Sequence, residues 1–117
     1  MSIGKQIIAS TRTIGVALSG CTIPGQEPTF DIPTDSMELG LGIHGEAGYL
    51  RTKRVSSSEM VKLCIDKLQQ DLTVNLNRGD RIAVLLNNLG GCTMLEMGVL
   101  VSNVLEEFGK SVQFVNI

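Results

Sequence analysis

The 117-residue sequence has no tryptophan, one tyrosine and three phenylalanines, so its core must be built from aliphatic side chains and methionine. Clustered positive charge is also missing, because ten basic residues stand against twelve acidic ones with no long run of either sign. This balance argues against a nucleic-acid surface and against binding to an anionic membrane. No apolar stretch approaches the ~18 residues of a membrane span, and the first residues lack the apolar segment of a signal peptide. We therefore expect a cytoplasmic protein.

Residues that ligate metals are scarce as well. Three widely spaced cysteines (Cys21, Cys64 and Cys92) form no Cys-x-x-Cys pair, and the sequence has a single histidine, His44. Such a ligand set argues against a zinc site, and we expect no metal. The cysteines fit reduced, partly buried thiols. The length suits a single domain over residues 1–117.

Hydrophobic spacing predicts the elements of the first half. Isoleucines at helical spacing indicate a short helix over residues 3–12, and β-branched and small residues indicate a strand over 14–21. All three prolines lie in residues 24–36, which we interpret as a surface connection. Strict alternation predicts a second strand over 37–43. One face of that strand carries Met37, Leu39, Leu41 and Ile43, and the other carries Glu38, Gly40 and Gly42. A face so rich in glycine suggests close approach by another segment or by a ligand.

Two amphipathic helices are predicted in the second half. Ser56 and Glu59 have the spacing of a capping box, and so do Thr93 and Glu96. An apolar stripe at helical spacing follows each pair. Gly109 is expected to stop the second of these helices.

Two further strands complete the expected order. Residues 81–88 form a run that is apolar on both faces, typical of a buried strand, and residues 111–117 follow the last helix as another. The order predicts an α/β fold with a mixed β-sheet packed with helices in two layers. The last strand–helix–strand unit should be a right-handed parallel crossover, and the strands ahead of it should pair antiparallel. Because the sequence ends on a strand, we expect the sheet to be incomplete at its C-terminal side.

The histidine lies in the stretch Gly-Ile-His-Gly-Glu, residues 42–46. Gly42 and Gly45 let the backbone approach a small ligand, and a neutral imidazole can act as a base, a ligand or a nucleophile toward an electrophilic carbon. Glu46 could orient the ring or take a proton. The alternative is a solvated loop histidine with Glu46 as a solubilising charge. Residue types alone favour that alternative, because one histidine and one glutamate form no triad.

A second glycine-rich stretch, Leu-Asn-Asn-Leu-Gly-Gly-Cys-Thr, precedes the last predicted helix. Backbone amides at such a place can cradle a phosphate group. The stretch lacks the lysine of a P-loop and the spacing of a dinucleotide fingerprint. A tight turn is therefore the favoured interpretation.

Three blocks of the sequence resemble the dihydroxyacetone (glycerone) kinases in the same order. They are TIGVALSGCTIPG, ELGLGIHGEAG and VLLNNLGGCTMLEMG, which begin at residues 13, 38 and 84. The form of the middle block is closest to the ATP-dependent, eukaryote-type enzymes. The resemblance implies that the chain is a fragment, part of the second domain of the substrate-binding kinase region.

The same resemblance implies roles for individual residues. His44 would form a covalent hemiaminal with the carbonyl carbon of dihydroxyacetone or a related small ketone or aldehyde, and Gly42, Gly45 and Glu46 would support the substrate loop. The full-length protein would transfer a phosphoryl group from ATP, with Mg²⁺, to dihydroxyacetone or glyceraldehyde, and would be a homodimer. The family's general base and its nucleotide-binding site lie in other domains. We therefore expect this chain to bind no cofactor and to be inactive alone.

Two alternatives remain open. A non-catalytic dihydroxyacetone-binding sensor, acting as a co-regulator through a partner, would keep His44 without the kinase domains. A small-ligand carrier with a similar fold would have no need for the histidine loop, so its ligand binding should survive His44→Ala.

Overall fold

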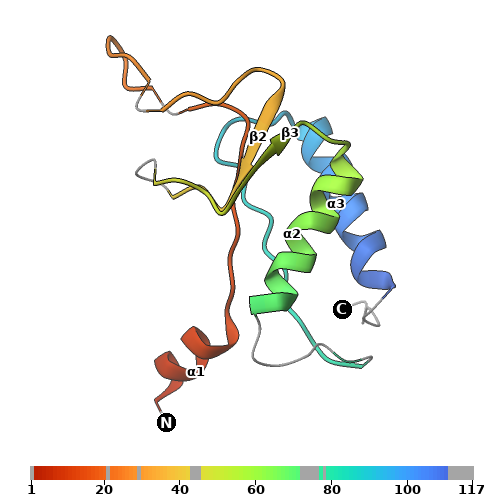
Figure 1. Ribbon diagram of the computed structural model, residues 1–117. Helices are drawn as coiled ribbons and strands as arrows, with labels where there is room; N and C mark the ends of the chain where they lie inside the picture. The colour runs from red at the N-terminus through yellow and green to blue at the C-terminus, as the bar shows by residue number, and fades with distance from the viewer. Residues whose placement is uncertain are drawn as a thin grey trace. The chain divides into compact units, whose positions relative to one another are not determined.

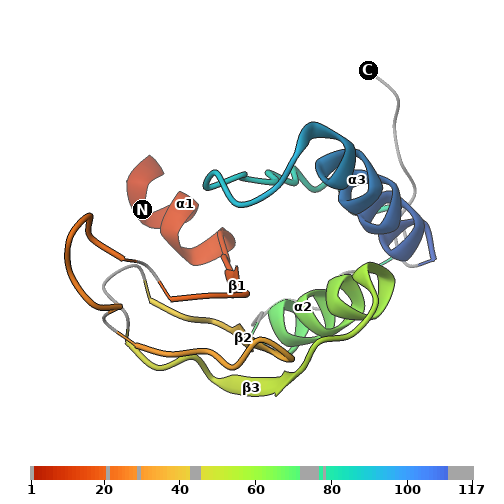
Figure 2. The ribbon, with the colours of Figure 1, turned by 90° about the horizontal axis from the view of Figure 1, so that it is seen from above.

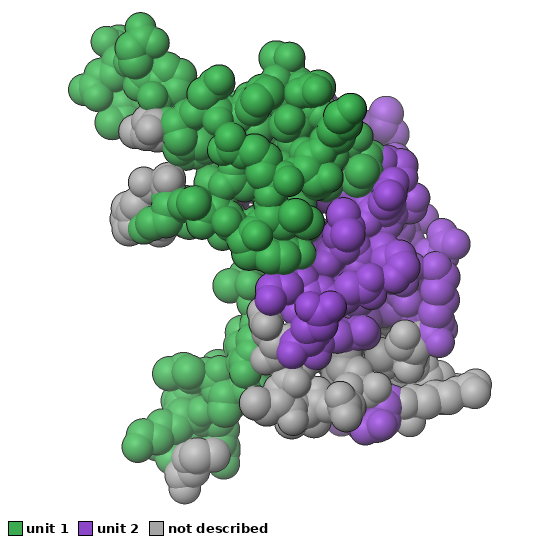
Figure 3. Space-filling view, viewed as in Figure 1, with its two compact units in different colours: residues 1–55 green, residues 56–117 purple. Residues whose placement is uncertain are grey.

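The computed structural model describes residues 2–20, 22–28, 30–42, 46–71, 77 and 79–110. The chain divides into two compact units, residues 1–55 and residues 56–117, which Figure 3 colours separately. In the described residues each unit has its own helices or strands and its own buried side chains. The expected single domain over residues 1–117 stays a prediction.

The described part of unit 1 has one helix and a small sheet (Figure 1). Helix α1 spans Ile3–Ser10, and strands β1, β2 and β3 span Val16–Ala17, Ser36–Leu39 and Leu50–Lys53. The strands lie in the order β1-β2-β3, and both neighbouring pairs are antiparallel. The predicted N-terminal helix and the predicted antiparallel strand pair are confirmed.

β2 forms the buried centre of this sheet. Met37 and Leu39 are 1% and 0% exposed, as the alternating pattern predicts for the apolar face. Glu38 lies between them on the other face, for which the sequence predicts close approach by another segment or a ligand, and it is also buried, at 3% exposure. The reason lies in β3, which the sequence pattern did not reveal. Its residue Arg51 is the register partner of Glu38.

In the described part of unit 2, two helices lie side by side (Figure 2). Helix α2 spans Ser57–Asp71, directly after Ser56, and helix α3 spans Met94–Gly109, directly after Thr93, so both predicted helices are confirmed. Their contact buries four side chains, with three partly buried ones packed against them. The four are Val61, Ile65, Val104 and Phe108, and the three are Ile82, Leu86 and Leu100.

The strand predicted over residues 81–88 is wrong. This segment forms neither helix nor strand, and no described segment pairs with it as a strand would. Ile82 and Leu86 lie against the helix pair, while Val84 and Leu85 are exposed. A buried strand needs cover on both faces, and this segment has it on one. The strand predicted over 111–117 lies outside the described residues, so the parallel crossover stays a prediction.

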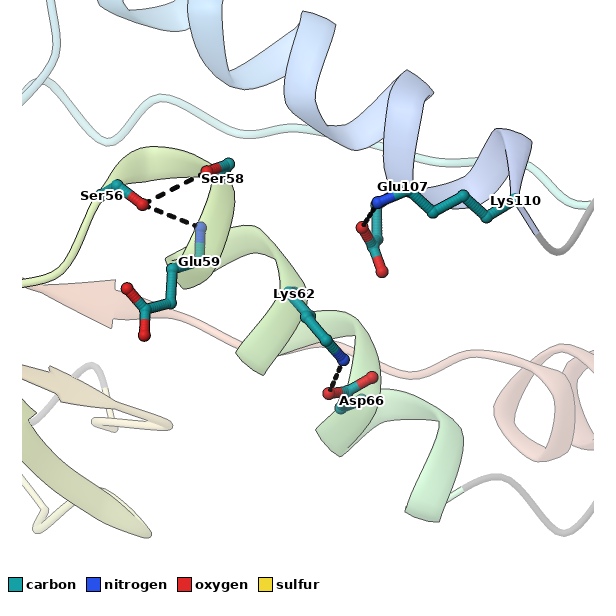
Figure 4. Close-up of polar contacts among 7 residues, drawn as sticks. All are labelled: Ser56, Ser58, Glu59, Lys62, Asp66, Glu107 and Lys110. Carbon is teal, nitrogen blue, oxygen red and sulfur yellow. Dashed lines mark hydrogen bonds and ion pairs between the residues drawn. The ribbon is translucent and has the colours of Figure 1, made fainter.

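Side-chain caps start both helices of unit 2. The Thr93 hydroxyl accepts from Glu96 N at 3.3 Å and the Glu96 carboxylate accepts from Thr93 N at 2.8 Å, which completes the predicted capping box. At α2 the Ser56 hydroxyl accepts from Glu59 N at 3.3 Å, while the Glu59 carboxylate points away from it (Figure 4). The cap of α2 is therefore half of the predicted box.

The C-terminal end of α3 differs from the expectation. Gly109 belongs to the helix and does not stop it. Lys110 follows in a right-handed conformation, and its N–H donates to the Glu107 carbonyl at 3.3 Å. Its ammonium group also pairs with the Glu107 carboxylate at 2.6 Å, so the last turn is closed by lysine and needs no left-handed glycine (Figure 4). A similar pair, Lys62 with Asp66, lies on the surface of α2.

Candidate functional site

The connection between β2 and β3 carries the histidine stretch. Ile43, His44 and Gly45 lie outside the described residues, and Gly42 and Glu46 flank them. The Gly42 N–H donates to the Glu46 carbonyl at 3.1 Å, as the two strands of a hairpin do across its tip. The residues on either side of the histidine segment are thus joined directly.

The base of this loop is fixed by two more backbone hydrogen bonds. Tyr49 N donates to the Leu39 carbonyl at 2.9 Å, and Gly40 N donates to the Gly15 carbonyl at 2.8 Å. Gly40 has φ +74°, a left-handed conformation that favours glycine. The chain turns there, so the strand predicted over residues 37–43 ends at Leu39.

Two glycines of the loop make room for the chain itself. A Cβ at Gly42 would overlap the carboxylate of Glu46, and a Cβ at Gly48 would overlap the carbonyl oxygen of Leu39. The space that a side chain would need at Gly42 is therefore occupied by Glu46, one of the predicted site residues. The described residues before and after the histidine segment thus pack against each other, at Gly42 with Glu46 and at Gly48 with Leu39.

A buried carboxylate supports the base of the loop, and sequence reasoning missed it. Glu38 Oε1 accepts from Gly48 N at 2.6 Å. Its Oε2 accepts from Arg51 Nε at 2.8 Å and lies 2.6 Å from Arg51 Nη2. The Gly48 amide first, and then the Arg51 guanidinium, hold the pKa of Glu38 below its ordinary value, so the group is ionised at neutral pH. The sequence offers no signal for this role, because a charge on an alternating strand is ordinarily exposed.

The second glycine-rich stretch is a self-contained turn. The Asn88 side-chain oxygen accepts from Gly90 N at 2.9 Å and Cys92 N at 3.3 Å, and its amide nitrogen donates to the Cys92 carbonyl at 2.7 Å. The start of α3 beyond it is occupied by the Glu96 carboxylate, whose pKa is lowered by hydrogen bonds from Thr93. The amides of Gly90, Cys92 and Thr93 are thus already bonded within the turn and cap, in agreement with the tight-turn interpretation.

The described residues offer little other chemistry. They contain no group of three histidine, cysteine or acidic side chains that could hold a metal ion. Burial raises the pKa of the Cys64 thiol to about 11, which makes it a poor nucleophile at neutral pH. None of the described helices is both long and apolar enough to span a bilayer.

Comparison with known proteins identifies the family. Residues 1–116 match the Dak1 domain, and the chain belongs to this family. It is 44% identical over 104 residues to triokinase/FMN cyclase of Homo sapiens, covering 84% of this chain and 18% of that protein. It is 38% identical over 106 residues to the dihydroxyacetone-binding subunit DhaK of a PTS-dependent dihydroxyacetone kinase of Listeria innocua, covering 90% of this chain and 32% of that subunit. The resemblance to the dihydroxyacetone kinases is confirmed.

Solved structures confirm the fold class. The dihydroxyacetone kinase from C. freundii in complex with AMP-PNP and Mg²⁺ matches with a TM-score of 0.61 and 31% identity, over 79% of this chain and 17% of that one. The dihydroxyacetone kinase operon co-activator DhaQ matches with a TM-score of 0.66 and 28% identity, over 96% of this chain and 36% of that one. The chain thus spans about a fifth to a third of the length of the curated relatives it matches.

Proposed function

We propose that this chain is the dihydroxyacetone-binding part of a longer kinase and that His44 captures the substrate through its carbonyl group. The observation that carries the proposal is the similarity to a dihydroxyacetone-binding subunit over 90% of the chain, which includes the loop with the single histidine. The described flanks of that loop, Gly42 and Glu46, are joined by a hydrogen bond from the Gly42 N–H to the Glu46 carbonyl.

The capture step is an addition in which no atom is lost. A neutral imidazole nitrogen of His44 donates its lone pair to the carbonyl carbon, and the π electrons of the carbonyl move to its oxygen. That oxygen gains a proton and the other ring nitrogen loses one, which leaves a neutral hemiaminal. We propose that Glu46 orients the ring or carries this proton, and that Gly42 and Gly45 support the loop. Glycerol has no carbonyl carbon and cannot form the bond, so capture selects the ketone by its chemistry.

Phosphoryl transfer belongs to the longer protein. The described residues contain no group of three histidine, cysteine or acidic side chains that could hold a metal ion, and the amides of Gly90 and Cys92 donate to Asn88. We propose that ATP and Mg²⁺ are held by a nucleotide-binding domain outside these residues, that a first kinase domain supplies the general base, and that the longer protein is a cytoplasmic homodimer. The chain alone should then convert no ATP in the presence of dihydroxyacetone.

Carbon-13 NMR of dihydroxyacetone labelled at its carbonyl carbon tests the capture. The labelled carbon should give a new signal of a tetrahedral carbon in the presence of the chain, and no such signal with His44→Ala. Labelled glycerol is the control and should show no new signal. An unchanged spectrum with the wild-type chain contradicts the proposal.

A second candidate function is a non-catalytic sensor. The match to the DhaQ co-activator, which covers 96% of this chain, favours it. A sensor would show the same NMR signal but would have no nucleotide-binding domain. ATP-dependent phosphorylation of dihydroxyacetone by the purified parent protein decides between the two.

A further inference from the structure

Glu38 is an unusual residue for the centre of a sheet. It is 3% exposed and lies between the fully buried Met37 and Leu39. The Glu38 side chain is 4% exposed while its partner Arg51 is 50% exposed, and burying a carboxylate in a core position costs free energy that an apolar residue would not. We therefore expect the charge at this strand position to have a role beyond the pairing of β2 with its neighbours.

The contacts of Glu38 reach beyond the sheet. The Arg51 guanidinium holds Glu38 Oε2, and Glu38 Oε1 accepts from Gly48 N at 2.6 Å. Gly48 lies in the loop, outside both strands. Two nitrogens of Arg51, Nε and Nη2, contact the same oxygen, Oε2, and leave Oε1 to the Gly48 amide. Arg51 thus orients the carboxylate so that its other oxygen faces the loop.

From Gly48 the support continues toward the histidine. Two residues before Gly48, the carbonyl of Glu46 accepts from Gly42 N at 3.1 Å, and the Glu46 carboxylate fills the space beside Gly42. Both ends of the histidine segment are therefore connected through Gly48 to the buried carboxylate. Movement of Gly48 would move this closure.

We infer that Glu38 and Arg51 form a positioning pair, which holds the loop of His44 in the shape that carbonyl capture requires. The inference rests on the proposed function of His44 and adds two residues that touch no substrate. Their effect passes through the Gly48 amide and the Gly42–Glu46 closure. The pair acts at the base of the loop, where β2 ends and β3 begins.

Three variants test the pair. Glu38→Gln keeps the size of the side chain, but its amide nitrogen would face the donors of Arg51. Arg51→Lys keeps the charge and removes the planar fork. Glu107→Gln is the matched control, because it removes the pair with Lys110 on α3 in the other unit. Fluorescence of Tyr49, the single tyrosine in a chain without tryptophan, verifies that unit 1 is folded in every variant.

Two measurements are made on each folded variant. The dihydroxyacetone concentration that gives half-maximal hemiaminal signal should rise about tenfold or more in Glu38→Gln and Arg51→Lys, since small misplacement of a reacting group has large effects. Hydrogen exchange of the Gly42 and Gly48 amides should become faster in both variants. Glu107→Gln should match the wild type in both measurements.

The outcomes separate the two claims. If the wild-type chain forms no hemiaminal, the proposed function fails, and the inference fails with it. If the wild type captures dihydroxyacetone and Glu38→Gln captures it equally well, the proposed function stands and the positioning pair is refuted. Weaker capture with unchanged exchange at Gly42 also contradicts the inference, because the effect would then not pass through the loop closure.

Discussion

Replacing Gly48 with alanine tests the packing at the base of the histidine loop. The added Cβ would overlap the carbonyl oxygen of Leu39 and lie 2.8 Å from Glu38 Cγ and 3.1 Å from the Leu39 carbonyl carbon. Two of these three atoms are backbone, so a side-chain rotation cannot relieve the overlap. The strand end must shift away from the loop.

The expected loss of stability follows from these contacts. Overpacking in a close-packed region lowers the free energy of unfolding by about 1–3 kcal/mol. A shift of Leu39 would also break the hydrogen bond from Tyr49 N to its carbonyl, worth about 1 kcal/mol net. The free energy of unfolding of unit 1 should therefore fall by about 2–4 kcal/mol. With a urea m-value of about 1.5 kcal/mol/M, the unfolding midpoint falls by roughly 1.3–2.7 M.

Tyr49 fluorescence during urea unfolding measures this change, because Tyr49 is the single tyrosine and lies in unit 1. Gly4→Ala is the matched control, since nothing lies within 4 Å of the Cβ it would add to α1. It should leave the midpoint unchanged or raise the stability by up to about 1 kcal/mol. A midpoint for Gly48→Ala equal to that of the wild type would refute the close approach of loop and strand.

Further changes test unit 2 and the titrating groups. Ile65→Ala leaves a cavity in the contact between α2 and α3 and should lower the free energy of unfolding by about 2–5 kcal/mol. The control Leu105→Ala, at an exposed position, should change it by about 0.5 kcal/mol, and far-UV circular dichroism in urea compares the two variants. Thr93→Ala removes a cap and should lower it by about 1 kcal/mol in the same assay. The pKa of Glu38 in the folded chain lies below its ordinary value of 4.5, so the ionised carboxylate stabilises the fold above pH 4.5 and this stabilisation is lost as the pH falls. The difference in urea midpoint between the wild type and Glu38→Gln should therefore shrink in acid. Cys64, with its pKa raised from 9.0 to about 11, should react with iodoacetamide at pH 8 about 100-fold more slowly in the native chain than in urea, and equal rates would contradict its burial.

The helices could be predicted because their signals are local. The caps and the apolar stripes of α2 and α3 lie within the segments that they define, and the observed bounds agree with them closely. Strands depend on partners elsewhere in the chain. The side chains of β3 alternate between partly buried and exposed over only four residues, which is too short a pattern to predict a strand. Its pairing with β2 is what defines it. The apolar run over 81–88 suggested a strand, but periodicity alone cannot show whether a partner strand covers it.

The candidate site divides in the same way. His44, Gly42 and Glu46 are predicted as site residues because they stand together in one short stretch that resembles a known family, and their roles stay predictions. Glu38 could not be predicted, since a charge on an alternating strand is ordinarily exposed. Its partners are ten and thirteen residues away, and the fold alone brings them together.

The central claim is that His44 captures the carbonyl carbon of dihydroxyacetone. The most direct measurement is the carbon-13 spectrum of carbonyl-labelled dihydroxyacetone mixed with the chain, recorded in parallel for the wild type, His44→Ala and Glu107→Gln. The account predicts, for the wild type and Glu107→Gln, a tetrahedral-carbon signal that dihydroxyacetone alone and its hydrate do not give, and no such signal for His44→Ala. A signal that persists in His44→Ala, or that is absent from the wild type, would contradict it.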